Sequence, residues 1–400
     1  MRYNRRKREH VSISQDTLCS LTNLDDFIAQ KLLIYRSDCS ILKPSMSDKL
    51  SSRRQNILAI LGSSEWLSVS DIAQKLNTQT SMATLRRELV AMVQQQLVQK
   101  QGYKKATRYS LAPTGLLFRV FQLSTYYAQE ETARGARETY NFELFPILAT
   151  ARIFTADELD RLNTATKTFR SNARGMDAAI HQKELERFVI EFAWKSSKIE
   201  GNTYTLLDTE FLLKNGTFAE GKSKHDATMI INHKNAYLFA AESTQDAVPI
   251  DTAYVERIHY LLTQGLGVRR GVRDKLVGIS GSLYQPLAVR QQLKEQLSVL
   301  LGTVSQLESV YAQALVAVLG LSYLQPFEDG NKRTARVLAN SLLLRGNTAP
   351  LSYRSVNERE YKEACLVFYE QNSLVAFKQL FIDQYIYSAT HYNIAQSSFS

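Results

Sequence analysis

Residues 325–336 read Gln325-Pro326-Phe327-Glu328-Asp329-Gly330-Asn331-Lys332-Arg333-Thr334-Ala335-Arg336, and a run of helix-forming residues with apolar positions at helical spacing follows. Gly330 interrupts the chain just before this run, so we expect a helix to begin near Asn331. Its first turns place Lys332, Arg333 and Arg336 at the positive end of the helix dipole, which is unfavourable unless an anion binds there. The pattern favours phosphate, held by free backbone N–H groups and by these cations.

Asp329, directly before the turn, can hold a Mg²⁺ ion that bridges phosphate oxygens, because Mg²⁺ prefers one or two carboxylates together with phosphates. Arg333 and Arg336 are three residues apart and therefore share a face of the predicted helix. The alternative interpretation is an ordinary helix start with an exposed basic face.

The same residues resemble the signature of the Fic (Fic/DOC) family, H-x-F-x-[DE]-G-N-[GK]-R-x-x-R, at every position except the first. The resemblance implies an all-helical bundle that moves AMP from ATP to a Ser, Thr or Tyr hydroxyl of a target protein. It implies that Asp329 binds Mg²⁺, that Asn331 and the amides around Gly330 hold the α-phosphate, and that Arg333 holds the outer phosphates. The implied ATP site comprises Gly330, Asn331, Lys332, Arg333 and Arg336.

Gln325 stands where the family signature has the His that takes the proton from the attacking hydroxyl. A Gln amide has no proton to exchange near neutral pH. Because general-base assistance typically contributes a factor of roughly 10² to 10⁴, we expect impaired transfer with ATP binding retained. No other His lies between His259 and His391, so the sequence offers no obvious substitute near this position.

A second segment, Ser196-Ser197-Lys198-Ile199-Glu200-Gly201-Asn202, ends a predicted helix from Leu185 to Ile199 and matches the family's inhibitory pattern [ST]-x-x-x-E-[GN]. The resemblance implies that Glu200, with Ser196 and Gly201, forms a brake in which the carboxylate pairs with Arg336 and occupies the place of the γ-phosphate. Such a carboxylate competes with any anion for the guanidinium. The alternative is a solvated Glu before a Gly that ends the helix.

Residues Lys275 to Pro286 combine β-forming residues with glycines and stop at a proline, which predicts a short hairpin. By resemblance this hairpin is a flap, with Gly278, Ile279, Ser280 and Gly281 at its centre, that aligns the target by strand addition. The alternative is a hairpin that only connects two helices.

The length of 400 residues and the 44% hydrophobic content predict two or three domains with ample core-forming material. No run of 18 apolar residues occurs, and the basic cluster from Met1 to Arg8 is not followed by a hydrophobic signal core, so we expect a cytoplasmic protein without membrane contact. Cys19, Cys39 and Cys365 are odd in number and widely separated, which indicates neither a disulfide framework nor a structural zinc site.

The formal net charge of +10 is concentrated near the N-terminus. Residues 1–112 contain 18 Lys and Arg against 9 Asp and Glu, whereas the remaining chain contains 31 against 30. A localised basic surplus is typical of a nucleic-acid binder.

This basic region has the order of a winged helix-turn-helix. Helices are predicted at Arg53–Leu61, Val69–Leu76 with Ser70 near its N-cap, and Ser81–Gln95, followed by strands at Leu97–Lys100 and Ala106–Leu111 around a basic tip. DNA would take the third helix in its major groove and the hairpin along its backbone. The candidate DNA-binding residues are Arg86, Arg87, Lys104, Lys105 and Arg108. The alternative is a winged helix used for protein contacts or dimerisation.

The predicted fold is mainly α: an all-helical Fic bundle with a short β-hairpin flap, preceded by a winged helix-turn-helix domain. Thr155, followed three residues later by Glu158, marks the first helix of the bundle. The expected layout is a basic segment at 1–50, the winged helix at 51–112, an ordered connector at 113–151, the Fic domain at 152–387 and a tail at 388–400.

Three interpretations remain open. The favoured one is a DNA-binding regulator whose Fic domain is a pseudoenzyme, able to bind ATP with Mg²⁺ but impaired in transfer. The second is an active AMPylase that obtains its base from the substrate or from water. The third is an engineered His-to-Gln form of an active enzyme. The expected partners are ATP and a hydroxyl-bearing target protein, with DNA or a second copy of the chain as further candidates.

Overall fold

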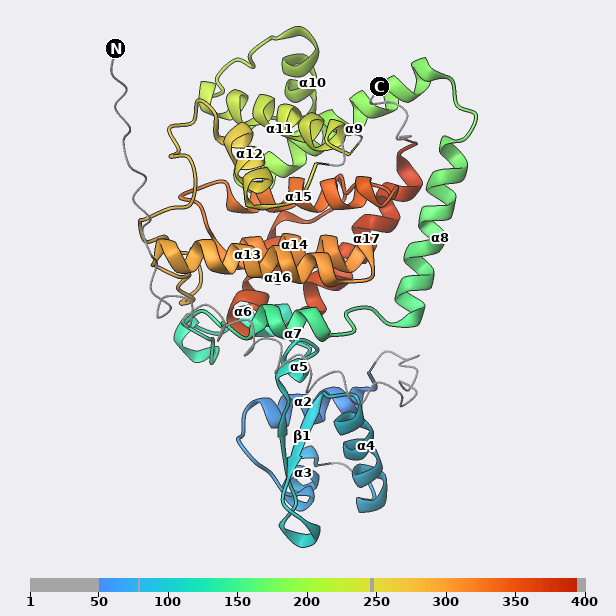
Figure 1. Ribbon diagram of the computed structural model, residues 1–400, viewed down its shortest axis with the longest axis vertical. Coiled ribbons are helices and arrows are strands. Elements are labelled where there is room, and N and C mark those ends of the chain that lie inside the picture. The colour runs from blue at the N-terminus through green and yellow to red at the C-terminus, as the bar shows by residue number, and fades with distance from the viewer. Residues whose placement is uncertain (1–49, 78–79, 245–247, 394–400) are drawn as a thin grey trace, which may run out of the picture. The chain divides into compact units, whose positions relative to one another are not determined.

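The computed structural model describes residues 50–77, 80–244 and 248–393, and within these ranges the chain is mainly helical with one two-stranded antiparallel sheet (Figure 1). The basic N-terminal cluster, Cys19 and Cys39 lie outside these ranges. None of the helices in the described ranges is long and apolar enough to cross a membrane.

Three helices and a hairpin make up the first part of the described chain: α2 (Ser52–Gly62), α3 (Val69–Leu76), α4 (Met82–Gln94), β1 (Val98–Gln101) and β2 (Arg108–Leu111). Ser68, not Ser70, caps α3, because its hydroxyl accepts from the Asp71 N–H while the Asp71 carboxylate accepts from the Ser68 N–H. The strands pair with Val98 opposite Leu111 and Gln101 opposite Arg108. Glu88 of α4 forms ion pairs with Arg53 and Arg54 of α2, at 3.1 and 3.7 Å.

The connector is held by the helical bundle that follows it. It contains α5 (Pro113–Leu116), α6 (Leu123–Tyr127) and α7 (Leu144–Thr150). Its backbone is tied to the bundle where the Leu374 N–H donates to the Leu117 carbonyl at 2.9 Å and the Arg137 N–H donates to the Glu370 carbonyl at 2.8 Å. This segment is therefore ordered by tertiary contacts and not by its own short helices alone.

Ten helices form the bundle in the described chain. They are α8 (Ala156–Ala173), α9 (Ala178–Ile199), α10 (Leu206–Asn215), α11 (Lys224–Glu242), α12 (Thr252–Thr263), α13 (Arg290–Gln306), α14 (Val310–Leu324), α15 (Asn331–Arg345), α16 (Glu358–Gln371) and α17 (Val375–His391). The expected capping box of Thr155 and Glu158 begins α8. Ordered structure extends past residue 387, because α17 continues to His391 and the hydroxyl of buried Tyr392 donates to Glu191.

Helices α14 and α15 pack side by side through the middle of the bundle, and nearly all their residues are buried (Figure 1). A helix that is apolar on every side belongs in a core, which is where α14 lies. Gly320 allows α13 to approach, since a Cβ at this position would lie 2.4 Å from a methyl group of Leu300. The turn from Gln325 to Gly330 joins these two helices and is therefore fixed by the centre of the fold.

The hairpin expected at 275–286 lacks the predicted strand pairing. Its turn is present, with the Ser282 N–H donating to the Ile279 carbonyl at 3.3 Å. The two arms are bonded to other segments instead of to each other: Arg273, between α12 and α13, holds the carbonyls of Lys275 and Leu287, and the Gln285 N–H donates to the Glu138 carbonyl of the connector. We call residues 275–287 the flap segment.

Candidate functional site

The start of α15 leaves backbone donors open, as the sequence predicted. Gly330 is the residue before the helix, with φ of 79°, and no side chain caps the helix there. The first intrahelical bond runs from the Thr334 N–H to the Gly330 carbonyl at 2.9 Å. The N–H groups of residues 331–333 therefore have no partner within the helix and are available to an anion.

The Asn331 side chain shapes the turn. Its Oδ1 accepts from the Phe327 N–H at 2.9 Å, and its Nδ2 donates to the Phe327 carbonyl at 2.8 Å. Asn331 is buried, so both ends of its amide are used to satisfy the backbone of the turn. The Asn331 side chain therefore sets the shape of the loop, while its own N–H is one of those left open at the start of α15.

His259 of α12 supports the same turn, although it lies 70 residues away in the sequence. Its Nε2 donates to the Asp329 carbonyl at 3.0 Å, and its ring stacks on Phe327 with ring centres 3.8 Å apart. Burial lowers the pKa of His259 to about 4, so the imidazole is neutral near pH 7. The sequence alone gave no signal for this contact. His259 does not line the cavity described next, so it offers no base there.

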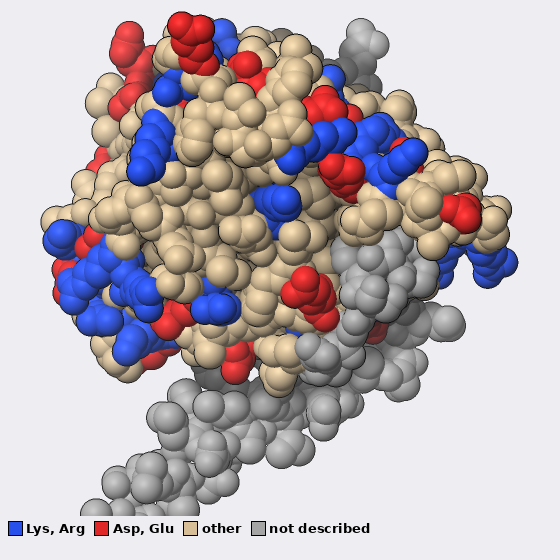
Figure 2. All heavy atoms as spheres, turned by 90° about the horizontal axis from the view of Figure 1, so that it is seen from above, with Lys and Arg blue, Asp and Glu red and all other residues tan. Residues whose placement is uncertain are grey.

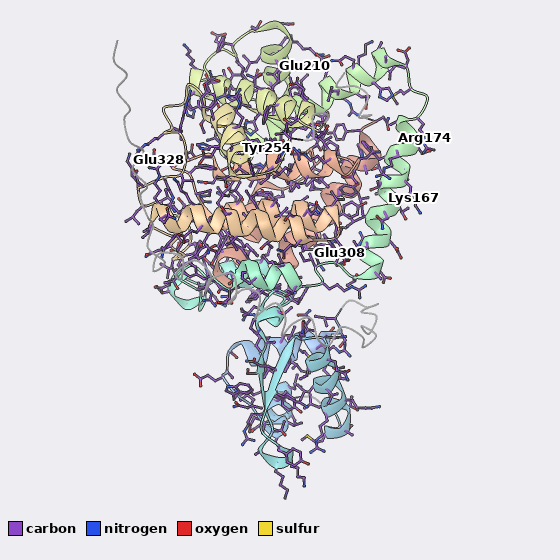
Figure 3. The ribbon with its side chains drawn as sticks, in the orientation of Figure 1. Lys167, Arg174, Glu210, Tyr254, Glu308 and Glu328 are labelled. Atoms are coloured by element: carbon purple, nitrogen blue, oxygen red, sulfur yellow. The ribbon has the colours of Figure 1, made fainter. Side chains whose placement is uncertain are left out.

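A cavity of about 390 Å³ lies above the turn. Its walls come from the turn and the start of α15, from the flap segment, from α16 and from the end of α9. Figure 3 locates the cavity through Glu328, one of its lining residues, which lies on the opposite side of the bundle from Lys167 of α8. The lining residues are Glu200, Val277, Gly278, Ile279, Ser280, Gln325, Glu328, Asp329, Gly330, Asn331, Lys332, Arg333, Tyr361, Lys362, Cys365, Leu366 and Tyr369.

Arg333 and Asp329 form an ion pair at the floor of this cavity. Arg333 Nη2 donates to Asp329 Oδ2 at 2.7 Å, while the Arg333 side chain is 3% exposed and the Asp329 side chain is 66% exposed. Arg333 Nη1 is buried without a hydrogen-bond partner in the described chain. The described residues contain no cluster of three metal-ligating side chains, so Mg²⁺ at Asp329 would require phosphate oxygens as further ligands.

Arg336, completely buried, pairs with Glu200 at the end of α9. The distance from Arg336 Nη2 to Glu200 Oε1 is 2.9 Å, and Lys332 Nζ lies 3.9 Å from Glu200 Oε2. Burial by itself would raise the pKa of Glu200, but the neighbouring cations, Arg336 foremost, outweigh it and hold this pKa below its ordinary range. Gly201, the next residue, has φ of 97°, a left-handed conformation that favours glycine. The chain therefore leaves the helix directly after Glu200, the C-cap of α9.

Ser196 and His233 fix the orientation of the Arg336 guanidinium. Arg336 Nε donates to Ser196 Oγ at 2.8 Å, and Arg336 Nη2 donates to the Ser196 carbonyl at 2.9 Å. His233 Nδ1 faces the Met229 carbonyl, which can only accept, so His233 Nε2 is the acceptor for the Ser196 hydroxyl at 2.9 Å. Burial, followed by Arg333 and Arg336, lowers the pKa of His233 to about 3. Sequence reasoning missed His233 because nothing in its local pattern distinguishes it from a core residue.

Gln325 directly follows the end of α14, begins the turn and adopts a left-handed backbone with φ of 50°. Its side-chain Nε2 donates to the Ser322 carbonyl at 2.7 Å, and its own carbonyl accepts from Arg273. Gln325 lines the cavity and is 9% exposed. The cavity thus brings together most of the predicted site residues: Glu200, Gly278, Ile279, Ser280, Gln325, Asp329, Gly330, Asn331, Lys332 and Arg333. The predicted residues Ser196, Gly201, Gly281 and Arg336 do not line it, and neither do the candidate DNA-binding residues.

Four of the five candidate DNA-binding side chains are exposed. Arg86 and Arg87 lie on α4, and Lys104 and Lys105 lie at the tip of the hairpin. Arg108 differs, because its guanidinium donates to the carbonyls of Lys105 and Thr107 at 3.4 and 3.3 Å and so folds back onto the tip.

Comparison with known proteins identifies the class to which this site belongs. Residues 249–343, which include the turn and the flap segment, match the Fic/DOC family. The chain therefore contains a Fic/DOC domain over these residues, and it is distantly similar to protein adenylyltransferases.

The relatives are remote and longer than the matched region. Protein adenylyltransferase fic-1 of Caenorhabditis elegans is 27% identical over 192 residues, covering 45% of this chain and 37% of that protein. Protein adenylyltransferase Fic of Drosophila erecta is 26% identical over 207 residues, covering 49% and 42%. The chain thus spans about two fifths of the length of these relatives. A solved fragment of Fic-1 from C. elegans has a TM-score of 0.50 at 20% identity, covering 59% of this chain and 71% of the fragment, which shows a shared fold.

The pKa of Glu200 predicts a pH-dependent contribution to stability. Because the folded pKa lies below the unfolded value of about 4.3, the ion pair stabilises the fold fully above that value and is lost as pH falls through the folded pKa. We expect Glu200→Gln to lower the free energy of unfolding by about 1–3 kcal/mol at pH 7, measured by urea denaturation, since Arg336 stays buried.

The difference between wild type and Glu200→Gln should shrink below about pH 4.3. Glu210→Gln is the matched control, because Glu210 pairs with Lys214 on the surface. A difference that stays constant from pH 7 to pH 3 would contradict the assignment.

Proposed function

We propose that this protein binds ATP with Mg²⁺ at the turn between α14 and α15 and transfers AMP poorly, because Gln325 occupies the position of the proton-accepting His. The observation that carries the proposal is the open N-terminus of α15 beside Arg333, whose buried Nη1 has no hydrogen-bond partner among the described residues. A buried guanidinium with an unused donor, facing a cavity and a row of free N–H groups, suits a phosphate group.

The residues of the site fit a nucleotide bound with Mg²⁺. The N–H groups of residues 331–333 would hold one phosphate, and Arg333 would turn its free donor to the outer phosphates. The Asp329 carboxylate is exposed; it would leave its ion pair with Arg333 and bind Mg²⁺, whose remaining ligands would include phosphate oxygens. Asn331 and His259 keep the turn in the shape that this binding requires.

Transfer of AMP requires that a proton be removed from the attacking hydroxyl, whereas binding of ATP does not. As the target's hydroxyl oxygen bonds to the α-phosphorus, the bond to pyrophosphate breaks and the hydroxyl proton must be removed. The Gln325 amide has no basic site near neutral pH, and its Nε2 is already engaged by Ser322. Gln325 can therefore line the site and contact a hydroxyl, but it does not take the proton.

Glu200 would add a second restraint. Its carboxylate already pairs with Arg336, the cation that the γ-phosphate of ATP would approach. An ATP molecule that displaces Glu200 loses this ion pair, whereas AMP, which lacks the γ-phosphate, leaves it intact. Glu200 therefore discriminates among nucleotides by the length of the phosphate chain.

Isothermal titration calorimetry tests the nucleotide site. Arg333→Ala should weaken Mg²⁺-dependent ATP binding by about 1.5–3 kcal/mol, which is roughly 10- to 150-fold, because it removes a charged hydrogen bond. Glu200→Gly should tighten binding of ATP more than binding of AMP. Arg161→Ala, on the exposed surface of α8, is the control. Equal gains for both nucleotides would refute the role of Glu200, and undetectable ATP binding in every variant would refute the site.

Transfer of α-labelled AMP from ATP, to the chain itself or to a target, tests the role of Gln325. Gln325→His should raise transfer by roughly 10² to 10⁴, and adding Glu200→Gly should raise it further, since the two residues limit different steps. Gln325→Asn is the matched control, because it supplies no basic group. If wild type transfers as fast as Gln325→His, the alternative of an active AMPylase with another base is favoured.

A second function, DNA binding, is proposed for residues 51–112. Arg86 and Arg87 on α4 and Lys104 and Lys105 at the hairpin tip are exposed cations on a helix and a hairpin of the winged helix-turn-helix kind. The rest of the chain has nearly balanced charge, and basic and acidic side chains are interspersed on the face of the bundle in Figure 2. The alternative is that the winged helix serves protein contacts or dimerisation.

Binding of the full chain to duplex DNA, followed by fluorescence anisotropy over a salt series, tests this second function. Affinity should fall steeply with salt, and Lys104→Ala with Lys105→Ala should weaken binding to all sequences and reduce the salt slope by about 2. Lys75→Ala, on α3, is the control. If the chain shows no DNA affinity at low salt but self-associates through this region, the protein-contact interpretation holds.

A further inference from the structure

Arg273, in the segment between α12 and α13, is buried against three backbone carbonyls. It is 1% exposed, and its Nε donates to the Gln325 carbonyl at 2.8 Å. Its Nη1 and Nη2 donate to the carbonyls of Lys275 and Leu287, each at 2.6 Å. Its own N–H donates to the Pro326 carbonyl at 2.9 Å. One residue thus connects the end of α14 with both ends of the flap segment.

The Arg273 guanidinium has no carboxylate partner among the ion pairs of the described chain. Burying a cation without a counter-charge is costly, and burial accordingly lowers the pKa of Arg273 from its ordinary value. The three carbonyls offset part of this cost only because a planar guanidinium presents its donors in a fixed fork. An ammonium group at this depth would reach fewer of them.

Other contacts also hold the flap segment: the Gln285 N–H donates to the Glu138 carbonyl at 2.8 Å, and Lys275 Nζ lies 3.6 Å from Glu328 Oε1. Its turn is held where Arg134 Nη1 donates to the Gly281 carbonyl at 3.0 Å, and Tyr284 near its second end donates to the Tyr323 carbonyl. It forms no strand ladder that would keep its two arms together. Residues 277–280 of this segment form one wall of the cavity, so the position of its two ends decides where that wall stands.

We propose that Arg273 is a positioning residue that holds the flap segment at a set place over residue 325 before any ligand binds. It acts through the carbonyls of Lys275, Leu287 and Gln325 and not by contact with a nucleotide. The consequence for the target protein rests on the proposed function, since a flap held in register with residue 325 would present the target's hydroxyl to the α-phosphate. The position of the flap itself does not depend on that function.

Limited proteolysis of the full chain tests the proposal without nucleotide. Trypsin can cut after Lys275, whose side chain is 71% exposed, but the carbonyl of that bond is held by Arg273. Arg273→Met should accelerate formation of the fragment beginning at Leu276 by about tenfold or more, because local release of the flap exposes the bond. Cleavage after Lys167 in α8 serves as an internal reference (Figure 3).

Arg269→Met is the matched control, because Arg269 pairs with exposed Asp274 and holds no carbonyl of the flap segment. If Arg273→Met does not fold, Arg273→Lys, which keeps the charge, takes its place in the test. Arg273→Lys should accelerate cleavage after Lys275 by a smaller factor. Unchanged cleavage after Lys275, or equal acceleration after Lys275 and Lys167, would overturn the proposal. The second outcome would make Arg273 a general support of the bundle.

Calorimetry separates this proposal from the proposed function. Arg273→Met should bind ATP with Mg²⁺ within about threefold of wild type, because Arg273 acts on the flap wall and not on the phosphate donors. A loss of ATP binding as large as that of Arg333→Ala would overturn the positioning role. If wild type bound no ATP at all, selectively accelerated cleavage after Lys275 in Arg273→Met would still support the positioning role of Arg273.

Discussion

The turn from Gln325 to Gly330 imposes the main constraint on this protein, because it joins two helices that are buried along nearly their whole length. The backbone groups of a buried turn must find partners within the protein. Here the partners are side chains from three places: Asn331 pairs with Phe327, His259 with Asp329, and Arg273 with Gln325. The conformation of the site is therefore part of the core and not a property of a mobile surface loop.

Charge is the second constraint on the same region. Arg333 and Arg336 are buried near the N-terminus of α15, where the helix dipole disfavours cations. Asp329 and Glu200 supply the compensating charge, one from the turn and one from α9. These ion pairs balance the buried cations without any ligand.

In the proposed function, binding and transfer depend on different residues. The proposed phosphate donors belong to α15 and its turn, and their positions are set by Asn331, His259 and Ser196. Residue 325 contributes its carbonyl to this framework, and any amino acid would supply the same carbonyl. The Gln side chain at this position is therefore compatible with the framework, although its amide is no proton acceptor near neutral pH.

Local chemistry in the sequence was enough to predict several features. Gly330 placed the start of α15, and Thr155 with Glu158 placed the start of α8. These predictions succeeded because capping and helix breaking depend on residues that are neighbours along the chain. The pair of Glu200 with Arg336 was expected only from the resemblance to the Fic family, because the two residues are far apart in the sequence.

The tertiary structure decided the rest. His259 and Arg273 reach the turn across 70 and 52 residues, His233 reaches Ser196 across 37, and none of them has a local pattern that marks it. The flap segment forms no strands, and its backbone groups instead pair with Arg273 and with Glu138 of the connector. What the sequence by itself determined was the set of groups able to bind phosphate; which side chains hold those groups in place was decided by packing, since it brings distant residues together.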